Sequence, residues 1–422
     1  MLRGAALKLK ILIVKFSDAS RAPRVLSQLE FLKGTEAEIT VAAHGNSPGY
    51  GVSFHQLRKP YGGMIKKLKQ FLQLLGWYRI VQLFFVAEYL DLKKLAASIK
   101  VSKKSKNASS AFDLVIVHDP FPLAFILNLF PGAKIHVDLH EYTPGQISKS
   151  NFLKYRVFQK YSIWICRKYL KYGDYFTTVC KPISRLYEKQ IGIKSEVIYN
   201  IPSAMKTQKI CDLSSDRRFV HHGVGTPERG AHKLVEFARY LPEGQSLTLI
   251  LVTPTVSSKI YVGELQRKVK AENLPVFFER PVASLQITKK LSEYDVFVYL
   301  LEDSTINHRL AMPNKFFEAI HAGLPVAIGP SEAMAEVVNE FAIGVVADTF
   351  DPKDLANKVS NISLDEWKDM RENLSKCSEK YSFVANKEAF LSYLKPVLGA
   401  SVAQRRSSTD ENTVSAYDRE FA

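Results

Sequence analysis

A lysine and a glutamate three residues apart stand at the start of one short segment, where they could bind a phosphate and a sugar. Lys315 and Glu318 follow Pro313, and the residues from Pro313 to Ala322 have the apolar spacing of an amphipathic helix. The first turn of a helix presents free N–H groups and a partial positive charge, so it suits a phosphate. The carboxylate there would be favoured by the helix dipole, or it would accept hydrogen bonds from two sugar hydroxyls.

The residues around this pair predict a loop, a helix, a turn and a strand. Pro313 suits the first helical position, where its missing N–H costs nothing. Gly323 suits the left-handed position after the helix, and Pro325 cannot continue the helix. Val326–Ile328 then has the composition of a short buried strand.

The run from Met312 to Val326 resembles the "PNK, two hydrophobic residues, E … AGLPV" signature of retaining glycosyltransferases of the GT-B fold, the family-four type (glycosyl transferases group 1). In that family the glutamate matching Glu318 binds the ribose of a nucleotide sugar. The neighbouring turn, here with Asn314 and Lys315, cradles the diphosphate. The resemblance implies an α/β protein with two Rossmann-like, doubly wound parallel-sheet domains and an interdomain cleft. The residues alone also allow an ordinary helix with a solvated, charged first turn.

A glycine-rich turn, Gly223 to Gly230, follows an expected strand and opens an expected helix. It resembles the family's phosphate-binding "G-R…K-G" segment, in which an arginine and a lysine clamp the diphosphate. Arg229 aligns with the lysine, but Val224 stands where the arginine is usual. We therefore expect Lys315 to supply the second cation.

The family's pair of glutamates separated by seven residues is also incomplete, because Leu310 stands where the first one belongs. In relatives that glutamate contacts the donor sugar. Asn307, His308 or backbone N–H groups are the candidates to replace it.

His140 follows a predicted strand, Lys134–Leu139, within an Asp-x-His-Glu run. This run resembles the same family, in which the matching histidine lines the donor-sugar pocket. A lone histidine is more often structural. The carboxyl end of a parallel strand lies at the ligand-binding edge of such a sheet, which favours a functional role.

The expected catalytic residues are His140, Arg229 and Lys315. No Asp-x-Asp occurs, so we expect no metal clamp on the diphosphate and no cofactor besides the nucleotide-sugar donor. Arg229, Lys315 and the helix N-terminus would stabilise the charge of the leaving group. The resemblance implies front-face attack with retention, in which the departing phosphate takes the proton of the acceptor.

The chain alternates strands and helices throughout, which predicts doubly wound domains. In the first half we expect a strand at Leu9–Lys15, a ligand over the loop Ser17–Arg24 that follows it, and an apolar helix over Ile80–Leu90. The expected domains are an N-terminal acceptor-side domain (1–202), a linker (203–216), a nucleotide-sugar domain (217–383), a helix crossing back to the first domain (384–398) and a disordered tail (399–422).

The composition is that of a globular protein, with 46% hydrophobic and 24% charged residues, but the net charge of +16 is unevenly placed. Residues 1–110 contain 19 Lys and Arg against 6 Asp and Glu. Residues 64–79 combine helical apolar spacing with lysines and aromatic residues, which suits an anionic membrane surface. Packing on the sheet with solvated lysines is the alternative. Single-stranded nucleic acid would suit the same mixture, but no recognisable motif supports it and we expect no nucleic-acid partner.

Four cysteines are widely spaced without a CxxC pair, which favours a reducing compartment. No stretch approaches 18 uncharged apolar residues, so no span of a bilayer is expected. We expect a cytoplasmic enzyme at the inner face of a membrane, transferring a sugar to a lipid-linked or glycan acceptor. A nucleotide-sugar epimerase, a catalytically degenerate GT-B binding protein and a basic nucleic-acid-binding protein remain the alternatives.

Overall fold

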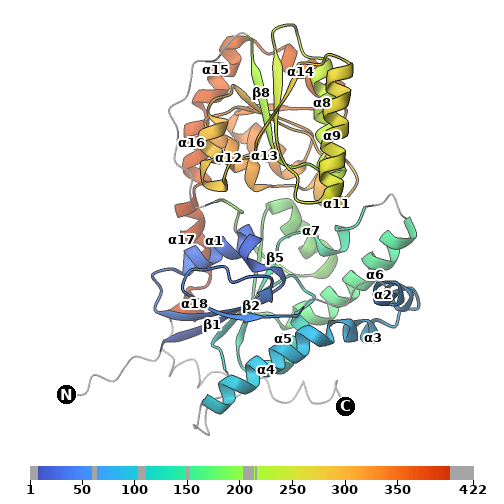
Figure 1. Ribbon diagram of the computed structural model, residues 1–422. Helices are drawn as coiled ribbons and strands as arrows, with labels where there is room; N and C mark the ends of the chain where they lie inside the picture. Colours follow the sequence, from blue (N-terminus) through green and yellow to red (C-terminus); the bar gives the residue numbers. More distant parts are fainter. Residues whose placement is uncertain are drawn as a thin grey trace, which may run out of the picture. The chain divides into compact units, whose positions relative to one another are not determined.

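The computed structural model describes residues 8–58, 64–102, 111–148, 152–202, 213 and 216–399. It forms two compact units, one of Met1–Ile198 with Lys387–Ala422 and the other of Tyr199–Asn386 (Figure 1). Below, these are unit 1 and unit 2. The expected linker (203–216) and tail (399–422) lie outside the described residues, apart from Leu213, Asp216 and Gly399.

Unit 1 contains a seven-stranded sheet in the order β3-β2-β1-β4-β5-β6-β7, and all its paired strands are parallel. The chain order reverses between β1 and β4, which is where doubly wound sheets bind ligands. The strands are β1 (Leu9–Asp18), β2 (Ala37–His44), β3 (Ser53–Gln56), β4 (Leu114–His118), β5 (Lys134–Leu139), β6 (Tyr175–Thr178) and β7 (Glu196–Val197).

Helices of unit 1 cover this sheet, and the end of α17 packs among them, since the Phe390 ring lies 5.3 Å from that of Phe31. The helices are α1 (Pro23–Leu32), α2 (Met64–Leu74), α3 (Tyr78–Gln82), α4 (Val86–Ser102), α5 (Leu123–Leu129), α6 (Phe152–Tyr169), α7 (Lys181–Ile191) and α18 (Lys395–Leu398). The helix α17 (Phe383–Tyr393) begins in unit 2 and ends in unit 1.

Unit 2 contains a six-stranded parallel sheet in the order β10-β9-β8-β11-β12-β13, which reverses between β8 and β11. The strands are β8 (Arg218–Val224), β9 (Ser246–Val252), β10 (Val276–Glu279), β11 (Val296–Tyr299), β12 (Val326–Ile328) and β13 (Gly344–Val346). The helices are α8 (Ala231–Arg239), α9 (Val256–Ala271), α10 (Ile287–Leu291), α11 (Ile306–Arg309), α12 (Asn314–His321), α13 (Glu332–Phe341), α14 (Pro352–Ser360), α15 (Leu364–Glu372) and α16 (Leu374–Lys380).

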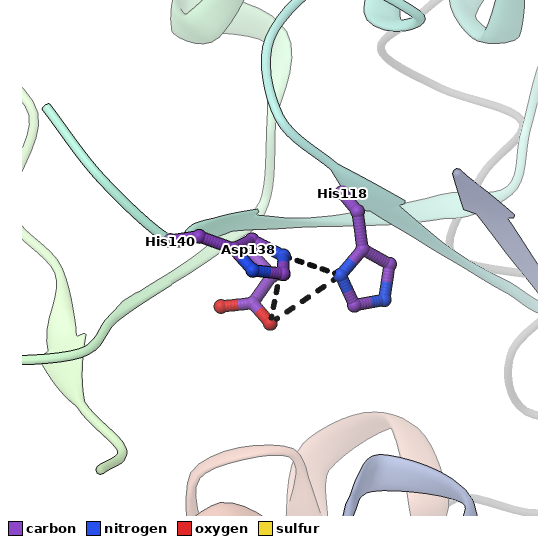
Figure 2. A group of neighbouring side chains, drawn as sticks. All are labelled: His118, Asp138 and His140. Carbon is purple, nitrogen blue, oxygen red and sulfur yellow. Dashed lines mark hydrogen bonds and ion pairs between the residues drawn. The ribbon is translucent and has the colours of Figure 1, made fainter. Parts of the chain in front are cut away.

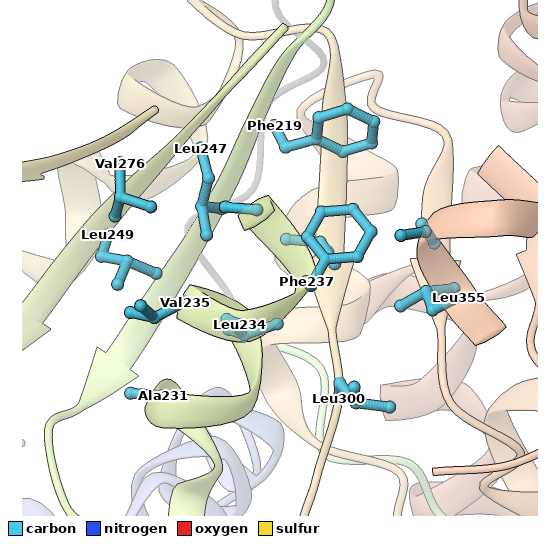
Figure 3. Close-up of a cluster of buried hydrophobic side chains, with 14 of the residues drawn as sticks. Phe219, Ala231, Leu234, Val235, Phe237, Leu247, Leu249, Val276, Leu300 and Leu355 are labelled. Atoms are coloured by element: carbon cyan, nitrogen blue, oxygen red, sulfur yellow. The ribbon is translucent and has the colours of Figure 1, made fainter. Parts of the chain in front are cut away.

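The core of unit 2 forms where α8, α9 and α14 cover one face of the sheet. Leu234 and Phe237 of α8 meet Leu247 and Leu249 of β9, and all four side chains are fully buried (Figure 3). A parallel strand buried on both faces is a continuous apolar run rather than an alternating one, and Leu249–Leu251 has that pattern. This packing fixes the carboxyl ends of β8 and β11, from which the side chains of the next section project.

The structure confirms the strand–helix alternation of both halves, and β12 begins and ends where the sequence predicts. The prediction of one helix over Ile80–Leu90 is wrong. A 3-10 turn, Leu83–Phe85, separates α3 from α4. It turns the Phe85 ring onto those of Phe16 and Phe121, at 5.7 and 6.4 Å, so tertiary packing overrides helical propensity there.

Candidate functional site

The turn after β8 is shaped by two glycines at which any other residue would be strained. Gly223 has a φ of +152°, and a Cβ on it would collide with the Nζ of Lys315. Gly230 has a φ of +74°, and a Cβ there would collide with the carbonyl oxygen of Leu300. Both positions therefore require glycine, because the backbone is left-handed or closely approached. The expected turn Gly223–Gly230 is thus packed directly against the start of α12 and the end of β11.

The helix α12 supplies Lys315 and Glu318 to this turn. Pro313 precedes the helix with an extended backbone instead of occupying its first position, and no side chain caps the N-terminus. Gly323 has the expected left-handed backbone, with a φ of +76°. Because Phe316 and Phe317 are fully buried, the helix is held firmly by its apolar face.

Glu318 is 7% exposed and is paired with a histidine that the sequence analysis did not single out. The Nε2 of His222, on β8, lies 3.0 Å from the Oε2 of Glu318. This contact leaves the other carboxylate oxygen for a ligand. The two atoms are at ion-pair distance, and the carboxylate is not completely buried.

Lys315 lies over the ring of Tyr299, with its Nζ 4.9 Å from the ring centroid. Burial, and then the nearby guanidinium of Arg229, lowers the pKa of Lys315 to about 7, against the opposing effect of Glu318. Burial raises the pKa of Tyr299 to about 12, while Arg229, which hydrogen-bonds its side chain, acts the other way. Two cations therefore converge at the carboxyl end of β11, in surroundings that disfavour the charge of Lys315.

This arrangement suits an anion next to a pair of hydroxyls. Lys315 is half-buried and its charge is disfavoured, a cost in free energy that a bound diphosphate would recover, while Arg229 beside it is exposed to solvent. The carboxylate of Glu318 lies on the same helix one turn further on, where it could accept hydrogen bonds from a diol. Asn314, the first residue of α12, stands at the helix end that faces the anion.

Leu310 and Val224, the two positions that depart from the family pattern, contribute no charged side chain to this site. Leu310 is buried, at 9% exposure, directly after α11. The Nδ1 of His308 lies 2.7 Å from the carbonyl oxygen of Glu302, so that imidazole is tied to the backbone. Val224 is 39% exposed at the end of β8. Arg229 and Lys315 therefore remain the cations that the described part of this turn and helix offers.

In unit 1, His140 joins a cluster with Asp138 and His118 (Figure 2). His118 ends β4 and is paired in register with Asp138 of β5, so the two side chains leave neighbouring strands on the same face. His140 follows two residues after Asp138 and shares that face. The Nδ1 of His118 lies 2.5 Å from the Nε2 of His140, and the Oδ2 of Asp138 lies 3.7 and 3.8 Å from these two nitrogens.

Asp138 is anchored from its other side by four hydrogen bonds. Arg24, which is 1% exposed, donates from Nε and Nη2 at 2.8 and 3.0 Å. Gln28 donates at 2.5 Å and the hydroxyl of Thr177 at 2.9 Å. Burial opposes the charge of Asp138, but Arg24 and the two histidines hold its pKa well below the usual value. Arg24, which the sequence placed at the end of a ligand-binding loop, is thus a buried structural cation.

The ligand atoms of His118, Asp138 and His140 lie within 4.8 Å of one another, a spacing that a metal ion can use. The chemistry of the cluster argues against one. Asp138 is already engaged by four donors, and the positive charges of Lys15 and Arg24 both act on His140. A dication would have to displace the donors of a carboxylate in the field of two cations. We therefore assign no metal to this cluster.

Residues 211–381 match the family model described as "Glycosyl transferases group 1". Among solved structures, HepE from Anabaena in complex with UDP and glucose is similar, with a TM-score of 0.63 and 15% identity over 92% of this chain and 99% of that chain. A glycosyltransferase from Rickettsia africae has a TM-score of 0.66 and 13% identity over 93% and 100% of the two chains. Sucrose-phosphate synthase from Thermosynechococcus elongatus has a TM-score of 0.64 and 14% identity over 93% and 100%. No curated protein sequence matches the chain significantly.

Proposed function

We propose that the chain, a glycosyltransferase of the GT-B fold whose residues 211–381 match the glycosyl transferases group 1, transfers a sugar from a nucleoside diphosphate with retention. One observation carries the donor site. Arg229, Lys315 and Glu318 meet at the point where the sheet of unit 2 reverses its strand order. Two cations and a carboxylate so placed match a diphosphate and a ribose.

We assign the diphosphate to Arg229, Lys315, Asn314 and the backbone at Gly223. The guanidinium and the ammonium would neutralise its charge, and the absence of a Cβ at Gly223 leaves room for the Nζ of Lys315 next to the main chain. Glu318 would accept hydrogen bonds from the ribose hydroxyls. The solved structures of HepE contain UDP or UDP-glucose, which supports a uridine nucleotide as the first donor to try.

The proposed reaction forms a bond between an acceptor oxygen and the anomeric carbon and breaks the bond from that carbon to the phosphate oxygen. The proton of the acceptor hydroxyl goes to the departing phosphate, so no protein base is needed. Arg229, Lys315 and the N-terminus of α12 stabilise the charge that develops on the leaving group, without a metal ion. Burial lowers the pKa of His140 to about 3, so this residue would contact the sugar as a neutral hydrogen-bonding group.

A thermal-shift screen tests the donor proposal. Ligands that bind only the native state raise the melting temperature, so UDP, GDP, ADP and their sugars can be compared at saturating concentration. We expect one nucleotide and its sugar to stabilise the protein, and that nucleotide sugar to be hydrolysed slowly without an acceptor. If none of the three families of nucleotide shifts the melting temperature, the donor site is wrongly assigned.

We propose that the acceptor is lipid-linked and that unit 1 binds the anionic inner face of a membrane. The residues 64–85 and 152–172 contain no Asp or Glu and together contribute ten Lys and Arg. In the structure α2 packs on α6, which brings these two stretches together. We call the following exposed side chains of these stretches the basic-apolar face: Lys67, Leu68, Phe71, Leu74, Trp77, Arg79, Leu83, Phe152, Leu153, Lys154, Arg156 and Lys160.

The apolar part of this face is too exposed for a surface that only meets water. Leu83 is 63% exposed, Trp77 55% and Phe152 69%, each beside basic residues. Apolar side chains with a basic rim match the boundary between headgroups and acyl chains. Lys69, in contrast, lies 4.1 Å from the centroid of the Phe85 ring, and burial lowers its pKa. None of the helices in the described part of the chain is long and apolar enough to cross a bilayer.

Replacing Lys154, Arg156 and Lys160 together by glutamine is expected to lower the partition coefficient onto anionic vesicles by about a hundredfold, because each basic residue near such a surface contributes about 1 kcal/mol. Sedimentation with phosphatidylglycerol vesicles measures this change. The matched control replaces Lys259, Arg267 and Lys270, three exposed residues of α9 in unit 2. Equal losses in both triple variants would mean that net charge alone drives the association.

A further inference from the structure

The hydrogen bond between His118 and His140 restricts where each imidazole carries its proton. His118 is 1% exposed, whereas the side chain of His140 is 19% exposed and reaches the surface of unit 1. Burial lowers the pKa of His118 well below its usual value, and it also lowers that of His140. Both rings are therefore neutral near pH 7, and each carries a single N–H.

Two proton arrangements can make this bond. In the first, the Nδ1–H of His118 donates to the Nε2 of His140, which leaves the proton of His140 on Nδ1. In the second, the Nε2–H of His140 donates to the Nδ1 of His118, which leaves the proton of His118 on Nε2. The other ring nitrogen of His140, Nδ1, is a donor in the first arrangement and an acceptor in the second.

The burial of His118 distinguishes the two. Its Nε2 is buried and has no hydrogen-bond partner. The second arrangement would place an N–H there without an acceptor, and orphaned N–H groups are the rarest kind of unpaired buried group in native proteins. The first arrangement leaves only a lone pair. Asp138 does not alter this choice, because its Oδ2 lies at similar distances from both contacting nitrogens, 3.7 and 3.8 Å.

We propose that His118 is a positioning residue that fixes the tautomer of His140, so that His140 presents its Nδ1–H as a hydrogen-bond donor to the substrate. This proposal rests on the proposed function only in its last step, the contact with substrate. The tautomer itself is a property of unit 1 alone. The anchoring of Asp138 by Arg24, Gln28 and Thr177 keeps the strand ends that carry the two rings in place.

Nitrogen-15 spectra of the histidine side chains in the full-length protein test the tautomer directly. In the wild type we expect the Nδ1 of His140 to be protonated and its Nε2 to be bare. His118→Leu removes the donor, and Asp138 becomes the nearest partner of Nε2 at 3.8 Å, so the proton of His140 should move to Nε2. His118→Asn keeps an N–H donor close to the position of Nδ1 and should keep the wild-type tautomer. His136, buried 2.8 Å from the hydroxyl of Thr177, reports whether this part of unit 1 stays folded.

The rate of turnover of the nucleotide sugar is the second measurement. We expect His118→Leu to lower kcat about tenfold, which is the effect of one misplaced hydrogen bond, and to leave the nucleotide affinity unchanged. The kcat of His118→Asn should stay close to that of the wild type. A wild-type His140 protonated on Nε2 would overturn the proposal, as would an unchanged tautomer or an unchanged kcat in His118→Leu. Should His118→Leu not fold, the wild-type spectrum alone decides. If the protein turns over no nucleotide sugar, the proposed function fails while the tautomer result still stands.

Discussion

Lys315→Met is expected to weaken binding of the donor nucleotide about a hundredfold, since a hydrogen bond to a charged group contributes about 1.5–3 kcal/mol and the diphosphate would lose its nearer cation. The same variant is expected to melt at a higher temperature than the wild type when no ligand is present. The amine lies beside Arg229 in surroundings that lower its pKa to about 7, so its charged form destabilises the empty protein. Calorimetric titration and thermal unfolding measure the two effects.

The opposite signs of these effects make the test specific for a binding site. A lysine that only stabilises the fold would lower the melting temperature when it is replaced. Lys233, which donates to the carbonyl oxygen of Phe350 at 2.8 Å, is a structural lysine of the same unit and supplies the control. Lys233→Met should lower the melting temperature and leave the intrinsic nucleotide affinity unchanged. If Lys315→Met behaves in the same way, Lys315 does not bind the donor.

Affinity for a nucleotide sugar is expected to be constant below about pH 7 and to fall about tenfold per pH unit from there to pH 9. The folded, empty protein has a Lys315 pKa of about 7, below the ordinary value of 10.5, so the ammonium loses its proton through neutral pH. Binding of an anion favours the charged amine and raises its pKa, so the complex takes up a proton above pH 7. A nucleotide sugar is the right probe, because the terminal phosphate of UDP itself titrates near pH 6.

Neither Arg229 nor His221 produces this profile. Arg229 stays charged over the whole range, and burial keeps the pKa of His221 well below its usual value. Lys315→Arg should therefore bind with an affinity that no longer depends on pH in this window. Titrations in buffers of different ionisation enthalpy measure the proton uptake. A wild-type affinity that stays level from pH 6 to 9 would show that Lys315 is charged throughout or is remote from the diphosphate.

The sequence predicted the donor helix because its signals are local. Proline, glycine and apolar spacing mark the limits of α12 within a residue, and β12 follows where the branched residues stand. Lys315 and Glu318 could be placed at one helix end from their spacing alone. Their position at one end of a helix was thus predictable before the fold was known.

The partners of these residues could not be predicted, because they come from distant parts of the chain. His222 reaches Glu318 from β8, and Arg24 reaches Asp138 across 114 residues. Arg24 was assigned to the rim of a ligand-binding loop because no local pattern distinguishes a buried arginine from an exposed one. The sequence did contain a signal for His118 and His222. Each stands at or near the carboxyl end of a parallel strand, and the same position was the reason for expecting a functional role for His140.

The limits of helix prediction are clearest between α3 and α4. The apolar residues from Ile80 onward have good helical spacing, yet the chain makes a 3-10 turn there. Aromatic stacking of Phe85 on Phe16 and Phe121 decides the backbone, and those partners lie in β1 and after β4. For the partners of the site residues and for the turn between α3 and α4, the missing information was the packing between distant elements.

The most direct test of the account is whether Glu318 holds the ribose of the donor. The dissociation constants of the preferred nucleoside diphosphate and of its 2′,3′-dideoxy analogue are measured with the wild type and with Glu318→Ala. We predict that the wild type prefers the natural nucleotide about a hundredfold, since two hydroxyls donate to a charged carboxylate, and that Glu318→Ala binds both ligands equally. A Glu318→Ala variant that keeps the wild-type preference would contradict the assignment of this site.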